Sequence, residues 1–471
     1  MPSLKRRTLL KLLGLGSVLG YSSFVPADLP PNSAVDVEFI QKSHKLYDVY
    51  RKLFNKRLDL KPRIIALCKT ELGIQQAVKY ANQQNLTVNI KSGGHSFEGF
   101  SLNNDGLVID VSLMNQISLN NNNQLITEPA VRLAQLYSYC LPKGRLLPSG
   151  SCASLGLSGI TLGGGYGLFA REFGLTCDYL TGFRMVDASG NIIDSDDDAE
   201  LLWACRGGGN GNFGVITQLR FDTVKAPTTL YQHRFRSFNV SAKQAAGLAN
   251  KWFEQTSGLP EHAFSAFVLN GKTLTVMLTA TQHDEKMEEV LNQFDKIMDK
   301  NADLNPDPIA VGIQYYYGRS QSLYFKNISA GYYESFGDIE ECAESLFSQV
   351  VKTPGMVFQI NTLGGKINNG ARAKDSSYAH RNANYLGEAQ FYWDKPEQMK
   401  SSLESMERIQ AALHANDVNQ HYVNYPDLNI ENYESSYYGE SYKRLQKVKQ
   451  RFDPDNRFNY SQSIKPLAKI S

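Results

Sequence analysis

The spacing of apolar residues predicts an α+β domain that begins near residue 62. Residues 63–68 are a mostly apolar run, which is typical of a short buried strand. Thr70 then makes a good helix N-cap before a segment with apolar residues at helical spacing. These residues share one face of the expected helix: Ile74, Ala77, Val78 and Ala81. Residues 86–90 and 106–111 are the next predicted strands, so strands and helices are interleaved.

Further along, the pattern predicts a hairpin over residues 183–194, with its turn at Ala188-Ser189-Gly190. The acidic run 196–200 is placed at a helix start, because carboxylates favour the positive end of the helix dipole. We therefore do not assign this run to a metal ion. Residues 215–217 form another predicted strand.

The character of the chain changes near Pro227. Residues 229–421 contain fewer glycines and show long helical patterns over 284–298 and 396–414, which indicates a second domain. The last segment contains a further predicted helix over 442–452, and Asp453-Pro454 ends it. The apolar residues of this helix lie on one face: Leu445, Val448 and Phe452.

Composition narrows the class of protein. The 471 residues are enough for two or three domains, and 42% hydrophobic and 20% charged residues are ordinary for a globular protein. The net charge of +2 gives no indication of nucleic-acid binding. The six cysteines include no CxxC pair, which argues against a zinc site, and they are too few for a disulfide-stabilised scaffold. One disulfide after export stays open.

The N-terminus has the features of a targeting segment. Lys5-Arg6-Arg7 precedes an apolar stretch, residues 8–19, that is too short and too rich in glycine to span a membrane. Adjacent arginines before such a stretch resemble a twin-arginine export signal. We predict a signal over residues 1–27 and a periplasmic or secreted protein with no stable membrane span. An ordinary secretory signal or a membrane anchor are the alternatives.

Three glycine-rich loops lie within the first 215 residues: Gly93-Gly94, Gly163-Gly164-Gly165 and Gly207-Gly208-Gly209. Consecutive backbone N–H groups without side chains can bind anions, so the loops suggest a cofactor with a diphosphate. None fits the GxGxxG fingerprint or a P-loop. The sequence therefore favours a cofactor fold of another kind.

Two reactive side chains stand in glycine-flanked loops, His95 in Ser92-Gly93-Gly94-His95-Ser96 and Cys152 in Gly150-Ser151-Cys152-Ala153. Taken singly, each is more often a structural residue. A hydrolase that pairs Cys152 with His95 is a formal alternative, but it leaves the glycine loops unexplained. Together they suggest a flavin attached at two points.

These loops, with the Gly163–Gly167 and Gly211–Thr217 stretches, resemble the FAD-binding domain of the vanillyl-alcohol-oxidase superfamily, the PCMH type. Tyr422-Val423-Asn424-Tyr425-Pro426-Asp427 and residues 452–458 extend the resemblance to the berberine-bridge-enzyme-like oxidoreductases. The similarity covers nearly everything after the predicted signal.

The resemblance implies an α+β fold in which an FAD-binding domain has two parts, residues 35–227 and 422–471. Residues 228–421 would form an inserted α/β substrate domain built on an antiparallel sheet. The active site would lie between the two domains.

The resemblance also implies which residues hold the cofactor. His95 matches the residue joined to the flavin 8α-methyl group, and Cys152 matches the residue joined to C6. Further cofactor-binding positions follow from the same motifs: Ser92, Gly93, Gly94, Ser96, Gly150, Gly156, Gly159, Gly163, Gly164, Gly167, Gly214, Val215, Ile216 and Asn424. No metal ligands are expected.

For the chemistry, Tyr425 matches a tyrosine that family members use as a base, and Glu388 is a second candidate. A free phenol has a pKa of about 10, so the site would have to lower it. Tyr422 is a neighbouring alternative, and Tyr315–Tyr317 could stack on a sugar or an aromatic substrate. Ser441 replaces an asparagine that many relatives have. Leu155 is bulky where the family controls oxygen access, which favours a dehydrogenase over an oxidase.

The sequence thus predicts an exported FAD-dependent oxidoreductase. It would oxidise an alcohol or carbohydrate hydroxyl by hydride transfer to a bicovalently attached flavin, which O2 or another acceptor reoxidises. Oxidation of an aromatic or secondary-metabolite substrate is the alternative among enzymes. A non-catalytic binding protein on the same scaffold is the alternative outside them.

Overall fold

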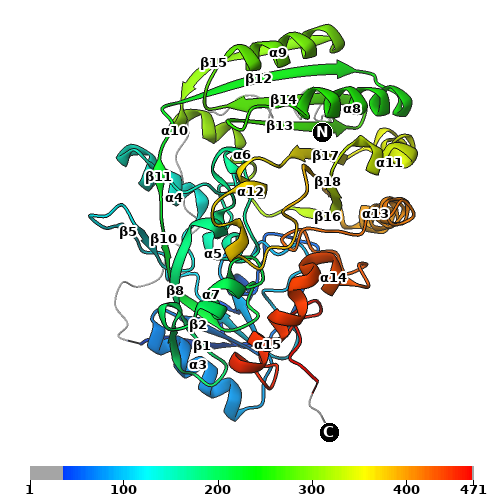
Figure 1. Ribbon diagram of the computed structural model, residues 1–471. Helices are drawn as coiled ribbons and strands as arrows, with labels where there is room; N and C mark the ends of the chain where they lie inside the picture. The colour runs from blue at the N-terminus through cyan, green and yellow to red at the C-terminus, as the bar shows by residue number, and fades with distance from the viewer. Residues whose placement is uncertain (1–34, 469–471) are drawn as a thin grey trace.

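The computed structural model describes residues 35–468, and within them the chain builds three large sheets (Figure 1). The predicted export signal, residues 1–27, lies outside the described residues. Helices and antiparallel sheets are mixed, so the α+β prediction is confirmed.

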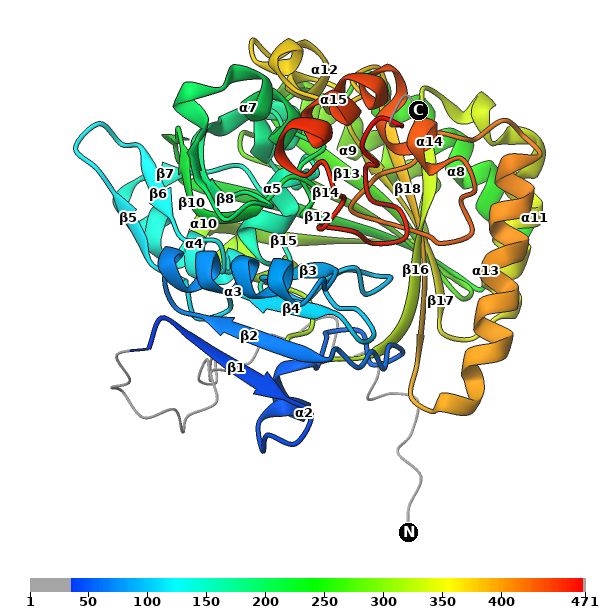
Figure 2. The same ribbon diagram turned by 90° about the horizontal axis from the view of Figure 1, so that it is seen from below.

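The first sheet has four strands in the order β1-β2-β4-β3. β1 pairs antiparallel with β2, and the other pairs are parallel. Its strands are β1 (Val37–Gln41), β2 (Ile64–Cys68), β3 (Val88–Lys91) and β4 (Leu107–Asp110). The helix α3 (Glu71–Gln83) begins at Thr70, whose side chain accepts a hydrogen bond from the Gly73 N–H, and its predicted apolar face is buried. Figure 2 shows α3 lying along this sheet.

The second sheet has five antiparallel strands in the order β5-β6-β10-β8-β9. They are β5 (Ile117–Leu119), β6 (Leu125–Thr127), β8 (Leu180–Val186), β9 (Ile192–Asp194) and β10 (Val215–Phe221). β8 and β9 form the predicted hairpin. Asp198 caps the N-terminus of α7 (Ala199–Cys205), so the acidic run begins a helix as expected.

The third sheet has seven antiparallel strands in the order β15-β12-β14-β13-β17-β18-β16. They are β12 (Thr229–Phe238), β13 (Ala263–Asn270), β14 (Thr273–Ala280), β15 (Lys300–Pro308), β16 (Tyr324–Tyr333), β17 (Met356–Thr362) and β18 (Tyr385–Trp393). One face packs on four helices: α8 (Ala242–Thr256), α9 (Glu285–Ile297), α11 (Glu340–Lys352) and α13 (Met399–His414).

Successive side chains of a strand point to opposite faces of the sheet, so every second residue of these strands points away from the helices. On β17, Phe358 and Ile360 pack against the helices, so Gln359 and Asn361 point to the opposite face. On β18, Ala389 and Phe391 belong to the same core, and Glu388 lies on the other side. The second face of the sheet therefore carries polar groups toward the rest of the molecule.

The last segment returns to the first two sheets. α14 (Tyr433–Tyr438) contacts α15 (Tyr442–Phe452), and α15 lies beside α7 and the glycine loop after it (Figure 1). The buried Lys449 Nζ donates to the backbone oxygens of Asn212 and Phe458, and Phe458 forms a bridge with Val88. We propose domain limits at residues 35–227, 228–421 and 422–471, because the seven-stranded sheet begins and ends inside the middle range.

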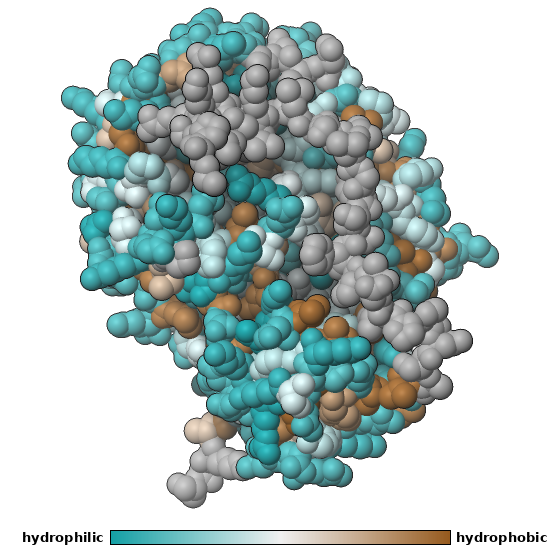
Figure 3. Space-filling view, turned by 180° about the vertical axis from the view of Figure 1, so that it is seen from behind, coloured by the Kyte–Doolittle hydropathy of each residue, from teal (hydrophilic) through white to brown (hydrophobic). Residues whose placement is uncertain are grey.

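The remaining chain includes short strands and helices that connect these layers. They are β7 (Arg145–Leu146), β11 (Val224–Lys225), α2 (Tyr47–Tyr50), α4 (Leu133–Cys140), α5 (Leu157–Leu162), α6 (Ala170–Phe173), α10 (Ile309–Gly312) and α12 (Lys366–Asn369). Within residues 35–468, no helix combines the length and the apolar character needed to cross a membrane. Where grey atoms do not cover it, the face in Figure 3 is mostly hydrophilic, with scattered hydrophobic residues.

Candidate functional site

A cavity of about 460 Å³ lies between the glycine loops, the polar face of the seven-stranded sheet and the returning C-terminal segment. Most of the predicted site residues line it: Ser92, Gly93, Gly94, His95, Ser96, Gly150, Cys152, Gly156, Gly159, Gly167, Gly214, Ile216, Glu388, Asn424 and Tyr425. Residues that are up to about 330 positions apart in the chain therefore share one site.

Three predicted cofactor residues are not among the lining residues of this cavity: Gly163, Gly164 and Val215. Gly163 faces the Asn424 side chain, and Gly164 faces the ring of Tyr378, so a Cβ at either position would collide with protein. Val215 is fully buried in the core beside the first sheet. Gly207, Gly208 and Gly209 are likewise not among the lining residues, and a Cβ at these positions would meet Tyr378, Leu445 and Cys205 respectively.

The loops that carry His95 and Cys152 approach each other closely because glycines stand at the contact. A Cβ on Gly93 would lie 2.7 Å from the Gly156 nitrogen. A Cβ on Gly167 would lie 2.1 Å from the Ser149 oxygen, just before the Cys152 loop. Glycine permits such an approach of two backbones, which explains why these positions lack side chains.

His95 is neutral at physiological pH. Burial, reinforced by the positive charge of Arg132, lowers the pKa of its imidazole to about 3. The ring stacks on Phe54 with 4.1 Å between the ring centroids. A neutral imidazole keeps a lone pair, as a nucleophile requires.

Cys152 differs from the other cysteines. All six lie among the described residues and are free thiols, but five are buried and only Cys152 is partly exposed. Burial raises the pKa of the other five thiols: Cys68, Cys140, Cys177, Cys205 and Cys342. Cys152 is therefore the accessible thiol, and it opens into the same cavity as His95.

The lining fits a large polar cofactor. Three lining side chains have buried oxygens without a hydrogen-bond partner: Ser101 Oγ, Asn210 Oδ1 and Asn327 Oδ1. Buried polar atoms are normally paired, so such atoms around a cavity are suited to a ligand. With two nucleophiles and a glycine-walled side, these residues fit FAD.

A chain of polar side chains crosses the cavity from the sheet to the C-terminal segment. Gln359 Nε2 donates to Asn361 Oδ1 (2.7 Å), and Asn361 Nδ2 donates to the Tyr166 hydroxyl (3.2 Å). The hydroxyls of Tyr166 and Tyr425 are 2.5 Å apart. Tyr422 does not join this chain, since its hydroxyl accepts from the Gly165 N–H and from Asn424 Nδ2.

The pKa values of the two candidate bases, Glu388 and Tyr425, are both raised, but to different extents. Burial raises the pKa of Glu388 to about 7, although hydrogen bonds from Gln390 and Asn327 oppose the shift. Burial and the charge of Glu388 raise the pKa of the Tyr425 phenol well above 10. This is the opposite of the direction that a tyrosine base needs, so the protein groups alone keep Tyr425 protonated.

Several cavity residues escaped the sequence analysis, notably Tyr166, Asn327, Gln359, Asn361 and Tyr392. Tyr166 stands inside the glycine motif that the analysis quoted. Gln359 and Asn361 alternate with the buried residues of β17, and this period-two pattern was an available signal. Of the three adjacent tyrosines, only Tyr316 lines the cavity, and its hydroxyl bonds to Thr279.

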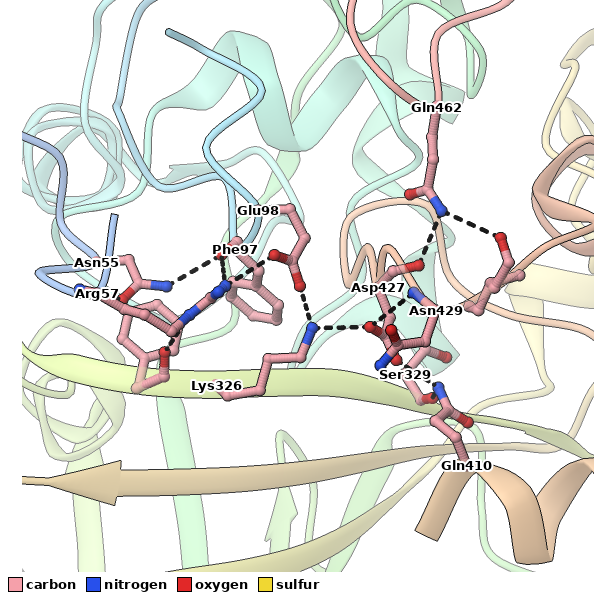
Figure 4. A network of polar contacts seen from close by, with 12 residues as sticks. Asn55, Arg57, Phe97, Glu98, Lys326, Ser329, Gln410, Asp427, Asn429 and Gln462 are labelled. Atoms are coloured by element: carbon pink, nitrogen blue, oxygen red, sulfur yellow. Dashed lines mark hydrogen bonds and ion pairs between the residues drawn. The ribbon is translucent and has the colours of Figure 1, made fainter. Parts of the chain in front are cut away.

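A buried ion network holds three distant segments together beside the site (Figure 4). Lys326 of β16 pairs with Glu98 and also with Asp427, the latter at 2.7 Å. Arg57 adds a second cation, 2.7 Å from Glu98. Phe97, next to Glu98, stacks on Tyr425 with 5.3 Å between the ring centroids. The network thus fixes the His95 loop, the sheet and the Tyr425 segment relative to one another.

Known protein families match the two parts of the chain that carry most of the predicted site residues. A family model for the FAD binding domain matches residues 62–196, and one described as berberine and berberine like matches residues 421–465. A carbohydrate oxidase from Microdochium nivale is 29% identical over 88% of this chain and 90% of its own length. An uncharacterized FAD-linked oxidoreductase from Bacillus subtilis is also 29% identical, over 88% of this chain and 95% of its own.

A solved structure of a glucooligosaccharide oxidase from Acremonium strictum superposes with a TM-score of 0.83 at 25% identity. The match covers 92% of this chain and 98% of that chain, and that oxidase carries a 6-S-cysteinyl, 8α-N1-histidyl FAD. The two matched regions and the shared fold show that this chain is an FAD-linked oxidoreductase similar to the berberine-bridge-enzyme-like proteins.

Proposed function

We propose that this oxidoreductase oxidises an alcohol or carbohydrate hydroxyl, with FAD attached to both His95 and Cys152. The observation that carries the proposal is the placement of these two nucleophiles in one cavity with Glu388 and Tyr425. When bound, the flavin would accept a hydride from the substrate carbon. The electron pair would then pass to O2 or to another acceptor.

Double attachment is supported by the state of each nucleophile. His95 is neutral, and Cys152 is the accessible thiol. Acid precipitation of the purified protein tests the idea: we expect the flavin to stay with the precipitate. Release of all flavin into solution would exclude covalent attachment.

Single substitutions then test whether the flavin is attached at one residue or at two. Cys152→Ala and His95→Ala should each keep one link and change the flavin absorption spectrum. Cys140→Ala is a matched control, because Cys140 is a buried thiol away from the cavity. An unchanged spectrum in Cys152→Ala would remove Cys152 from the site.

For proton transfer, we propose Glu388 as the general base and Tyr425 as its hydrogen-bonding partner. A carboxylate with a pKa near 7 is well matched to accept the hydroxyl proton at neutral pH. A protonated Tyr425 can donate to the carboxylate or orient the substrate oxygen. From the sequence, Tyr425 ranked first as the base and Glu388 second. We reverse that ranking because the pKa of Glu388 is about 7, whereas the pKa of Tyr425 is raised well above 10.

A hydroxyl-rich substrate fits the sheet side of the cavity best. Gln359, Asn361 and Asn327 present amides there, and amides can both donate to and accept from hydroxyl groups. Aromatic rings also line the cavity, but Phe54 already stacks on His95 and Phe97 on Tyr425. This favours sugars over the aromatic or secondary-metabolite alternative.

Bleaching of the flavin without oxygen distinguishes these substrate classes. Oligosaccharides and simple sugars should bleach it, and aromatic alcohols should not. Bleaching by aromatic alcohols alone would overturn the carbohydrate proposal. Readmission of air then tests the acceptor: Leu155 lines the cavity, and we expect it to slow recolouring in air.

We also propose export by the twin-arginine route, on the basis of Lys5-Arg6-Arg7 and the apolar residues that follow. Replacing Arg6 and Arg7 with lysine should leave the protein inside the cell in a host with that pathway. Unchanged export would indicate an ordinary secretory signal.

A further inference from the structure

One guanidinium nitrogen joins the two loops that carry the nucleophiles. Arg132, the residue before α4, donates from Nη1 to the Gly93 oxygen (2.7 Å) and to the Ser154 oxygen (2.8 Å). Gly93 is two residues before His95, and Ser154 is two residues after Cys152. Arg132 is therefore in direct contact with both loops.

The segment around Arg132 holds the two loops in different ways. Backbone hydrogen bonds tie it to the Cys152 loop: Leu133 N to Leu155 O, Ala134 N to Ala153 O and Leu157 N to Val131 O. Side chains tie it to the His95 loop, through Arg132 and through Ser92 Oγ, which donates to the Pro129 oxygen at 2.7 Å. The position of His95 relative to Cys152 is thus sensitive to Arg132.

Ser154 is the point where these contacts meet. Its oxygen accepts from Arg132, and the His95 ring also interacts with its backbone. Its hydroxyl lies 3.7 Å from the Cys152 thiol. The positive charge of Arg132 also helps to keep the His95 imidazole neutral. Arg132 therefore influences both the geometry and the protonation state of the pair.

We propose that Arg132 is a positioning residue that aligns the His95 and Cys152 loops so that both side chains reach one flavin ring. The inference rests on the proposed bicovalent attachment. Each attachment would replace a C–H bond of the flavin with a C–N or C–S bond. The displaced hydrogen and the hydrogen of the nucleophile would leave as protons, and dioxygen would take up the electron pair and two protons to become hydrogen peroxide.

Mass spectrometry of digested holoenzyme tests the proposal without relying on activity. In the wild type, one flavin should connect the His95 peptide to the Cys152 peptide. Arg132→Gln should raise the singly linked fraction about tenfold or more, because it removes the cation that donates to both the Gly93 and the Ser154 oxygens. Arg132→Lys should restore part of the double linkage, because an ammonium group can donate to both oxygens.

Arg145→Gln is the matched control. Arg145 also donates to a backbone oxygen, but its side chain bonds to Thr223 and not to the Gly93 or Ser154 oxygens. This variant should remain doubly linked. If Arg132→Gln fails to fold, Arg132→Lys carries the test, and its singly linked fraction should exceed that of the wild type because an ammonium group replaces the planar guanidinium.

The outcomes separate the two proposals. A wild type without covalent flavin would overturn the proposed function itself. A doubly linked wild type together with uniformly doubly linked Arg132→Gln, or uniformly doubly linked Arg132→Lys where Arg132→Gln does not fold, would overturn only the role of Arg132.

Discussion

The two walls of the cavity differ in what lines them. On the loop side, backbone lines the cavity, because Gly93, Gly156 and Gly167 have no side chains and let backbones come close together. On the sheet side, polar side chains such as Gln359 and Glu388 line it, and they alternate along their strands with residues of the core. Changes in size should therefore disrupt the first wall, and changes in chemistry should disrupt the second.

The largest effect is expected on the sheet wall. Glu388→Gln keeps the size of the side chain but removes the base, so kcat should fall by about 10²–10⁴, the usual contribution of general acid–base catalysis. Covalently bound flavin should be unchanged. In the wild type, kcat should rise with pH through about 7 as Glu388 loses its proton, and the variant should lose this rise.

Glu172→Gln is the control for this change, because burial also raises the pKa of Glu172 and it does not line the cavity. Its rate and pH profile should match the wild type. The stability of Glu388→Gln is a second check. Burial raises the folded-state pKa of Glu388, so the wild type loses stability as the pH rises from about 4.5 to 7. The variant should therefore be the more stable protein at pH 8 and lose this advantage below pH 4.5.

The next largest effect is expected at Lys326, whose ion pairs connect the two walls. Lys326→Met leaves Glu98 and Asp427 without their shared cation, and breaking a buried ion pair costs about 3–5 kcal/mol of unfolding free energy. Denaturant unfolding measures this loss. Lys42→Met removes a cation from the exposed pair with Asp105 and should change stability by less than about 1 kcal/mol. Equal losses in the two variants would show that the network does not hold the walls together.

On the loop wall, Gly167→Ala should destabilise the protein by about 1–3 kcal/mol, because the added methyl group meets the Ser149 oxygen. It should also reduce the amount of bound flavin per protein. For stability, Gly159→Ala is the matched change, since a Cβ there has no protein neighbour within 4 Å. Equal losses of stability in both variants would mean that close backbone approach is not what Gly167 provides.

The smallest effect is expected at Tyr425, which lies between the walls. Tyr425→Phe removes a donor but not the base, so kcat should fall only about tenfold, the equivalent of one hydrogen bond. The rise of kcat through pH 7 should remain. If instead Tyr425→Phe abolishes this rise and Glu388→Gln retains it, Tyr425 is the base and our assignment is reversed.

Local elements followed from the sequence because local interactions determine them. The Thr70 cap and the apolar face from Ile74 to Ala81 specified α3, and the turn at Ala188-Ser189-Gly190 specified the β8–β9 hairpin. Motif resemblance likewise identified the FAD-binding class, and it singled out His95 and Cys152 as the proposed attachment points. The glycine motifs did not indicate which glycines line the cavity, because a glycine beside a ligand and a glycine beside a neighbouring side chain cannot be told apart in sequence.

The sequence by itself determined the helices and strands named above, the class of cofactor and the two residues, His95 and Cys152, that we propose as its attachment points, because each depends on neighbouring residues or on a short motif. The tertiary structure alone decided which side chains meet. It placed Lys326 between Glu98 and Asp427, Arg132 between two loops, and Glu388 in a cavity that raises its pKa to about 7. These outcomes depend on burial and on contacts between segments far apart in the chain, and no local pattern records either.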